Sequence, residues 1–248
     1  MLFIVATPIG NLGDLSVRAI ETLRSVDTVL AEDTRVTRKL LNHIEANPKL
    51  ERFDEHTAYA KIPAIVERVM GGEQVALVSD AGTPGISDPG QALIDAVLAT
   101  GEGGVFSLPA TVPITVIPGP SAVIAALTAS GLPTDSFYFG GFLPRKKKAL
   151  RETLEALASL DTTLVFYESP KRVVTSLEAA AEILGQRRGA IVRELTKIHE
   201  EVVRGMLPQL AEQLKARDSI KGEIVLLIAP AQKVRTARVH VDKYAHQN

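Results

Sequence analysis

Cysteine is absent from this chain of 248 residues, which excludes a disulfide framework, a thiolate metal site and a cysteine nucleophile. The five histidines show no metal-ligand spacing, so no metal site is predicted. No apolar run is long enough to cross a bilayer. The N-terminal segment Met1–Ala6 is too short for a signal peptide and lacks its basic region, so it is interpreted as a strand. We expect a soluble, cytoplasmic protein with no membrane partner.

Two common nucleotide-binding motifs are also missing. The chain has no dinucleotide fingerprint, and its most glycine-rich loop lacks the Lys-Ser/Thr ending of a P-loop. The net charge of −1 argues against a general polyanion binder. Basic residues are nevertheless clustered, because residues 145–151 carry five of them and no acid, and the tail from Ala231 carries four against one acid.

Strand-like and helix-like segments alternate along the chain, which predicts an α/β protein with a mostly parallel sheet. In the first half the expected strands are 2–6, 28–31, 74–79 and 114–117, and the expected helices are 17–23, 36–44, 62–70 and 91–99. In the second half the expected strands are 137–140, 163–167, 190–193, 200–204 and 223–228, and the expected helices are 122–128, 147–160, 173–184 and 207–215. The last strands follow one another closely, which predicts some antiparallel pairing.

The pattern restarts after Pro118 and so predicts two α/β domains. We place an N-terminal domain at residues 1–118, a C-terminal domain at 119–230 and a basic tail at 231–248. The segment Gly101–Pro113, rich in glycine and proline, is expected to be a surface loop or an extra hairpin.

Three glycine turns follow expected strands: Thr7–Asn11, Ser79–Gly90 and Pro118–Ala122. An open α/β sheet binds its ligand at the carboxyl ends of its strands, where glycines allow close backbone approach. In the second turn Asp80 would supply a hydrogen-bond acceptor beside Gly82. These turns predict a ligand site, although ordinary connecting turns remain the alternative.

Three further segments have two possible interpretations. Ala31–Arg35, with Glu32, Asp33 and Arg35, is either a capped helix start or part of the same cleft as Asp80. In Phe166–Arg172, Tyr167 could stack on a planar ring while Lys171 and Arg172 hold phosphate, or the segment only starts a helix. The charged stretch Arg193–Glu201 could be only a β-hairpin.

A basic loop, Arg145–Lys148, lies beside the aromatic residues Phe137, Tyr138, Phe139 and Phe142. Cationic side chains next to aromatic rings suit single-stranded nucleic acid, through phosphate contacts and base stacking. A solvated charged face is the alternative interpretation.

Taken in order, seven motifs resemble a branch of the tetrapyrrole-methylase superfamily. That branch is the bacterial small-subunit ribosomal RNA methyltransferases that act on a cytidine 2′-hydroxyl of the decoding region. The resemblance extends from about residue 2 to Pro230. The motifs are residues 7–11, 31–35, 79–90, 117–122, 141–146, 166–172 and 193–201.

The resemblance implies a homodimer of two-domain chains, with S-adenosylmethionine (SAM) in the cleft between the domains and ribosomal RNA of the assembled or assembling small subunit as partner. It implies that the cofactor is bound by Pro8, Gly10, Asp80, Gly82, Thr83, Ile86, Ser121, Ala122, Tyr167 and Leu195. RNA would be contacted by Arg145, Lys146, Lys147, Lys171 and Arg172. Many members of this branch continue into a small helical C-terminal domain, which the chain lacks, and their connection at Gly101–Pro113 is shorter.

Methyl transfer to a ribose hydroxyl needs a positioned nucleophile and benefits from a base. We hypothesise that Glu32 or Asp33 supplies that base or orients the hydroxyl, and that Arg35 binds phosphate. Two rival functions stay open: a porphyrinoid methyltransferase of the same superfamily, and a ribosome-associated RNA-binding protein with a degenerate SAM pocket.

Overall fold

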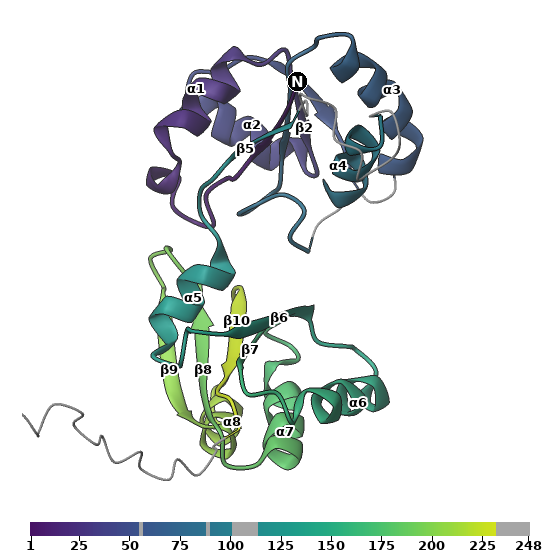
Figure 1. Ribbon diagram of the computed structural model, residues 1–248. Coiled ribbons are helices and arrows are strands. Elements are labelled where there is room, and N and C mark those ends of the chain that lie inside the picture. The colour runs from purple at the N-terminus through teal and green to yellow at the C-terminus, as the bar shows by residue number, and fades with distance from the viewer. Residues whose placement is uncertain (55–56, 88–89, 101–113, 232–248) are drawn as a thin grey trace, which may run out of the picture.

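The computed structural model describes residues 1–54, 57–87, 90–100 and 114–231 (Figure 1). Two sequence expectations, the insertion at Gly101–Pro113 and the basic tail beyond Ala231, lie outside the described residues. No helix in the described part is long and apolar enough to span a bilayer.

The N-terminal lobe is a five-stranded parallel sheet between two layers of helices. Its strand order is β3 (Lys49–Arg52), β2 (Thr28–Ala31), β4 (Val75–Val78), β1 (Leu2–Val5) and β5 (Ile114–Ile117). One face packs on α1 (Val17–Ser25) and α2 (Thr34–His43), the other on α3 (Ala58–Met70) and α4 (Gly90–Leu98). A short 3₁₀ turn at Leu12–Asp14 precedes α1.

The near-continuous apolar strands explain this layering. Successive side chains of a strand point to opposite faces, so a strand buried on both faces is apolar throughout. In β1, Ile4 belongs to the cluster with α3 and α4, whereas Val5 belongs to the cluster with α1 and α2. The central strands β2 and β4 are buried at every residue.

The C-terminal lobe is a mixed five-stranded sheet. Its order is β6 (Phe137–Phe142), β7 (Thr163–Glu168), β10 (Ile224–Ile228), β8 (Arg188–Arg193) and β9 (Glu201–Met206). Only β6 and β7 pair in parallel, so the predicted antiparallel pairing is confirmed. Helix α5 (Ala122–Ser130) covers one face, and α6 (Lys147–Leu157), α7 (Val173–Leu184) and α8 (Leu207–Lys215) cover the other.

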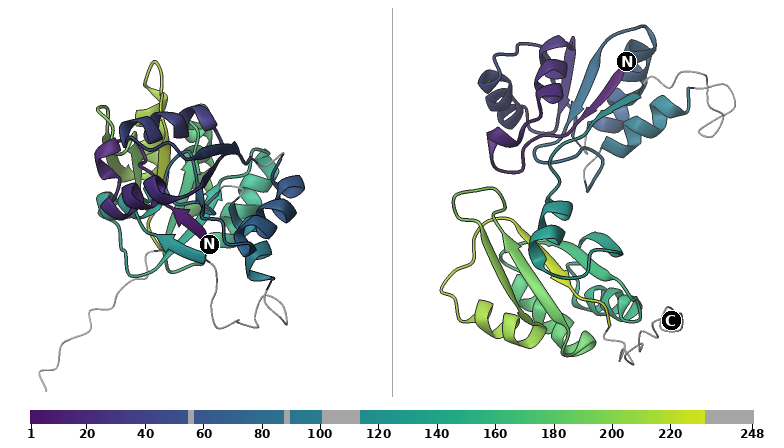
Figure 2. Two further views of the ribbon diagram at one scale, coloured as in Figure 1. Left: turned by 90° about the horizontal axis from the view of Figure 1, so that it is seen from above. Right: turned by 60° about the vertical axis from the view of Figure 1, so that its left-hand side comes forward.

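The two lobes have separate cores. Figure 2 shows them as two bodies, with the chain passing from β5 into α5 between them. Among the described residues, each hydrophobic cluster draws all its members from one lobe. The predicted class of two α/β domains is confirmed, and the predicted boundary at residue 118 falls in the connection between β5 and α5.

Four of the differences from the sequence expectation have a clear local description. β3 was not predicted, because Lys49–Arg52 is a charged edge strand without an apolar pattern. Helix α3 begins at Ala58, four residues early, because the turn at Asp54 accepts hydrogen bonds from the backbone N–H groups of Thr57 and Ala58. β6 runs on through two glycines to Phe142, and α6 ends at Leu157 rather than residue 160.

Candidate functional site

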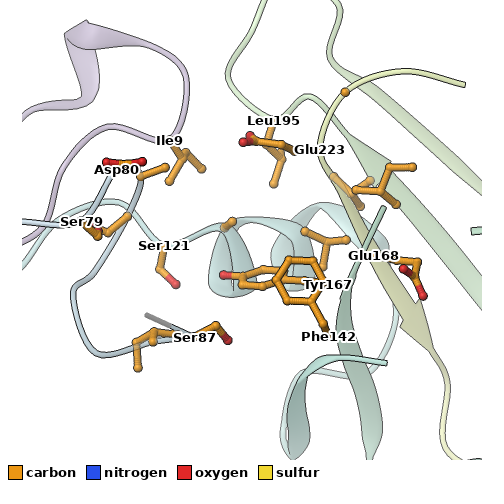
Figure 3. Close-up of a pocket in the computed structure, with 18 of the residues that line it drawn as sticks. Ile9, Ser79, Asp80, Ser87, Ser121, Phe142, Tyr167, Glu168, Leu195 and Glu223 are labelled. Carbon is orange, nitrogen blue, oxygen red and sulfur yellow. The ribbon is translucent and has the colours of Figure 1, made fainter. Parts of the chain in front are cut away.

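A cavity of about 410 Å³ opens between the lobes at the carboxyl ends of β1, β2 and β4. Figure 3 shows side chains of both lobes facing it. From the N-terminal lobe come Ile9, Glu32, Ser79, Asp80, Ala81, Gly82, Thr83, Ile86 and Ser87. From the C-terminal lobe come Ser121, Ala122, Phe142, Tyr167, Glu168, Ser169, Pro170, Val192, Leu195, Gly222, Glu223, Ile224 and Val225.

The floor of the cavity is made by two glycine turns joined through their backbones. Thr7 N–H donates to the Gly82 carbonyl at 2.8 Å, and Gly82 N–H donates to the Thr7 carbonyl at 3.1 Å. The hydroxyls of Thr7 and Ser79 add bonds to carbonyls of the same turn. Gly82 has φ +84°, which favours glycine because a Cβ is strained there. The turn after β4 is therefore held rigidly against the turn after β1.

The segment that connects the two lobes packs against these glycine turns. The Thr83 hydroxyl donates to the Pro120 carbonyl at 3.4 Å. A Cβ on Gly119 would lie 3.0 Å from the Cβ of Ala6, so the connecting chain passes directly over the end of β1. Ser121 and Ala122, at the start of α5, thereby reach the cavity beside Thr83.

The opposite wall is largely apolar and carries a cluster of three aromatic rings that meet edge to face or tilted. Tyr167 has its ring centroid 5.0 Å from that of Phe139 and 5.5 Å from that of Phe142. In Figure 3 the rings of Tyr167 and Phe142 lie side by side in front of the sheet. Val192 and Val225 line the same wall.

Eight of the ten side chains expected to bind the cofactor line this cavity; Pro8 and Gly10 do not. Gly10 faces the β8–β9 loop instead, where a Cβ would lie 2.5 Å from Lys197 Cγ and 2.9 Å from the Thr196 hydroxyl. The absence of a side chain at Gly10 thus allows the two lobes to touch. Lys197 is itself held by Glu194 at 2.9 Å and Glu223 at 2.8 Å.

The three residues expected at the catalytic position separate into two groups. Glu32 lines the cavity. Asp33 turns away, caps α2 through Arg35 N–H and forms an ion pair with the Arg35 guanidinium at 2.6 Å. The hydrogen bond from Arg35 holds the pKa of Asp33 far below its usual range. Because a carboxylate of such low pKa is a poor proton acceptor, Glu32 is the better placed of the two acids.

The basic residues expected to meet RNA also differ among themselves. Arg145, Lys146 and Lys147 are exposed at the start of α6, and Lys171 is exposed before α7. Arg172 is occupied: its guanidinium bonds to Glu168 Oε1 at 2.5 and 2.8 Å and to the Leu143 carbonyl at 2.9 Å. This gives Arg172 a structural role; its contact with RNA stays a prediction.

Sequence reasoning missed the part of the wall that comes from the last strand and its neighbour. Val192, Gly222, Glu223 and Val225 line the cavity because β10 and β8 pair in the middle of the sheet. Phe142, Ser169 and Pro170 lie in motifs that the sequence singled out for other reasons. The one sequence signal for this part of the wall was Gly222, a glycine just before an apolar strand.

The cavity suits a small molecule with one polar and one apolar end. Its volume lies in the range of ligand sites. Asp80, Thr83 and Ser121 offer polar groups near the glycine turns, while Leu195 and Val225 offer an apolar surface opposite. SAM, with charged amino-acid and flat adenine ends, fits this division, and the contact of Tyr167 with the adenine ring stays a prediction.

Comparison with protein-family models matches residues 1–211 to the Tetrapyrrole (Corrin/Porphyrin) Methylases. Among curated proteins, a "Ribosomal RNA small subunit methyltransferase I" of Mesorhizobium japonicum is 46% identical over 243 residues, covering 98% of this chain and 79% of that protein. The protein of the same name from Bacillus subtilis is 40% identical over 255 residues, covering 98% and 84%.

Solved structures show the same fold. The methyltransferase CobJ superposes with a TM-score of 0.66 at 20% identity, covering 94% of this chain and 96% of its own. A uroporphyrin-III C-methyl transferase from Thermus thermophilus, complexed with S-adenosyl homocysteine, superposes with a TM-score of 0.60 at 19% identity, covering 91% and 96%. Together, the family match and these superpositions confirm the fold expected from the sequence motifs.

Proposed function

The chain belongs to the tetrapyrrole (corrin/porphyrin) methylases, a family of SAM-dependent methyltransferases, and from this premise we propose that it methylates small-subunit ribosomal RNA. The observation that supports an RNA substrate is that the cavity wall leads directly into a basic loop of the C-terminal lobe. Phe142 lines the cavity, and three residues later the exposed basic loop begins at Arg145. A porphyrinoid carries carboxylates that basic side chains also bind, so the identity of the labelled acceptor, measured below, separates the two substrates.

We further propose that the acceptor is a 2′-hydroxyl of a cytidine in the decoding region, as the sequence motifs imply. SAM, when bound, supplies an electrophilic methyl group. The chain's own contribution is to hold the two reactants together while excluding water, a positioning effect that effective molarities place at about 7–11 kcal/mol.

Glu32 is proposed to act on the attacking hydroxyl. Its carboxylate lines the cavity, where it would orient the hydroxyl and accept its proton as the oxygen becomes a nucleophile. General bases contribute about 10²–10⁴-fold to rate. Asp33 would hold the start of α2 in place, and Arg35, exposed beside it, remains available to an RNA phosphate only at the expense of its ion pair with Asp33.

The basic side chains would set the affinity for RNA. Arg145, Lys146, Lys147 and Lys171 are exposed and can each neutralise a phosphate, which makes binding depend steeply on salt. We propose that the reaction takes place in the cytoplasm, because its proposed substrate is the small ribosomal subunit.

We propose that the active form is a homodimer. Two observations support this assembly: β5 ends its sheet with Val116 at 55% exposed, and the neighbouring helix α5 carries Ile124 at 51% exposed. A contiguous exposed apolar patch marks an interface, and these two side chains are the residues proposed to contribute to one. Sedimentation of the wild type and of Val116→Asp tests it; a wild type that sediments as a monomer would refute it.

The central experiment is transfer of radiolabelled methyl from SAM to unmodified small ribosomal subunits. We expect one labelled nucleotide, whose 3′-neighbouring bond resists alkaline cleavage because the 2′-hydroxyl is blocked. Glu32→Gln should lower kcat by at least 10²-fold at unchanged SAM affinity, while Asp33→Asn should have a much smaller effect. Binding of SAM without labelling of RNA would favour a non-RNA acceptor, and failure to bind SAM would favour a degenerate pocket.

A further inference from the structure

The strand β6 contains an irregularity that controls where Phe142 points. In the pairing of β6 with β7, Phe139 lies opposite Val165 and Phe142 lies opposite Tyr167. Three steps along β6 therefore correspond to two along β7, which is the definition of a bulge with one extra residue. The extra residue falls in Gly140-Gly141.

The bulge reverses the direction of the side chains that follow it. Side chains alternate along a regular strand, so residues 139 and 142 would point to opposite faces. Here both rings contact Tyr167, at 5.0 and 5.5 Å between centroids. Phe142 is thus turned out of its regular position and onto the face that carries the cavity.

The two glycines make this arrangement possible. A Cβ on Gly140 would lie 2.5 Å from the ring of Phe166, and Gly141 has φ +61°, a conformation that favours glycine. Gly141 also approaches the other lobe, since its Cβ would lie 3.3 Å from the Ser87 hydroxyl. The bulge therefore sits at the mouth of the cavity, where the two lobes face each other.

Phe142 does not serve the hydrophobic core. Its exposed fraction is 59%, and it is not a member of any core cluster of the described residues. One part of its ring contacts Tyr167 and the rest faces solvent at the cavity (Figure 3). A strand distorted to expose an aromatic ring beside a ligand cavity indicates that the ring contacts a ligand.

Phe142 lies on the side of the cavity that leads to the basic loop. Asp80 and Ser79 project from the turn after β4, whereas Phe142 is followed directly by Leu143, Pro144 and the basic side chains from Arg145. A nucleotide whose phosphate reaches that loop would bring its base to Phe142. Base–aromatic stacking contributes about 1–3 kcal/mol per base and accepts any base, because every base has a π face.

Resting on the proposed function, we propose that the base of the acceptor nucleotide stacks on the exposed face of Phe142. The substrate is then an unpaired nucleotide, or one extruded from its stack, because a base held in a helix cannot lie on the ring while its ribose enters the cavity. Phe142 positions the acceptor and does not choose among bases.

The test measures three quantities for Phe142→Ala, Phe142→Leu and Phe142→Trp: binding of unmodified small subunits, kcat/KM for methyl transfer at saturating SAM, and the Kd for SAM. We expect Phe142→Ala and Phe142→Leu to weaken both subunit binding and kcat/KM by about 5- to 150-fold, the equivalent of one stacked base. Phe142→Trp should restore them. SAM affinity should stay within twofold, and the melting temperature should not change.

Tyr59→Ala is the matched control. It removes an exposed aromatic side chain, 77% exposed, from α3 of the N-terminal lobe, where it does not line the cavity, so it should behave as wild type. A parallel loss of SAM affinity in the Phe142 variants would assign the ring to the cofactor and overturn the inference, as would normal activity and subunit binding in Phe142→Ala. If the wild type itself labels no RNA, the proposed function fails instead.

Discussion

Removal of the Arg172 guanidinium should destabilise the C-terminal lobe, although sequence motifs predict an RNA contact for this residue. The partner, Glu168, has a side chain that is completely buried. Its carboxylate accepts two bonds from Arg172, one from the Ser176 hydroxyl at 2.6 Å and one from Ser169 N–H at 2.7 Å. Arg172→Ala would leave this buried carboxylate without its opposite charge.

The magnitude follows from the burial of the pair. Breaking a buried ion pair by removing one partner costs about 3–5 kcal/mol. Because the Arg172 side chain is 26% exposed, water would compensate part of the loss, so about 3 kcal/mol is expected. For a lobe of about 110 residues, with an unfolding entropy of about 2.1 cal/mol/K per residue, that corresponds to a fall in Tm of roughly 13 °C.

The assay is thermal unfolding with RNA binding measured well below Tm, and the neighbouring residue supplies the control. Lys171→Ala removes an exposed charge one position away, so it should leave Tm unchanged and reduce the salt dependence of RNA binding. Arg172→Ala should lower Tm and leave the salt dependence of RNA binding unchanged. An Arg172→Ala variant that melts like wild type but binds RNA weakly would refute the structural assignment.

Three further predictions concern acid stability, lobe contact and RNA affinity. Hydrogen bonds from arginines lower the pKa of Glu73 and Glu201 to about 2, so their stabilising contribution is complete above pH 4.5 and is lost as pH falls toward 2. Glu73→Gln should therefore reduce the slope of the unfolding free energy against pH in this acid range by up to about 1.4 kcal/mol per pH unit. An unchanged slope would contradict this prediction. Gly10→Ala should clash with Lys197 and weaken SAM binding about tenfold through overpacking. The double variant with Lys197→Ala should recover part of the affinity, because the Thr196 hydroxyl, 2.9 Å from the added Cβ, remains; calorimetry that shows no change in the single variant would exclude the contact. Lys147→Ala should lower the slope of log K against log salt for RNA binding by about 1, and an unchanged slope would mean that this side chain makes no phosphate contact.

The fold could be predicted where buried elements give the sequence a recognisable apolar pattern. Parallel strands such as β1 and β4 are covered on both faces, so they appear as apolar runs bounded by turns. The edge strand β3 carries no such signal, because Lys49 and Arg52 are exposed and Leu50, which packs against a core cluster, is its one apolar residue. Strand order was equally hidden, since it depends on contacts between segments far apart in the chain.

The site residues could be predicted where they lie in turns next to predicted strands, but not where strand pairing brings them to the cavity. Asp80 and Ser121 stand in glycine turns after strands, which marks them without any knowledge of pairing. Gly222 and Val225 reach the cavity only because β10 enters between β7 and β8. The direction of Phe142 depends on one inserted residue in β6, and the periodicity of the sequence gives the opposite face.

The separation of the two cores has a consequence for how the chain is made. The last strand of the first sheet, β5, ends at Ile117, and β1 pairs with it along its whole length. Every strand and helix of the N-terminal lobe has therefore been synthesised before the first turn of α5 leaves the ribosome. Domains fold as units during synthesis, N-terminal first. The floor of the cavity can thus form early, and the apolar wall assembles over it as the second half of the chain emerges.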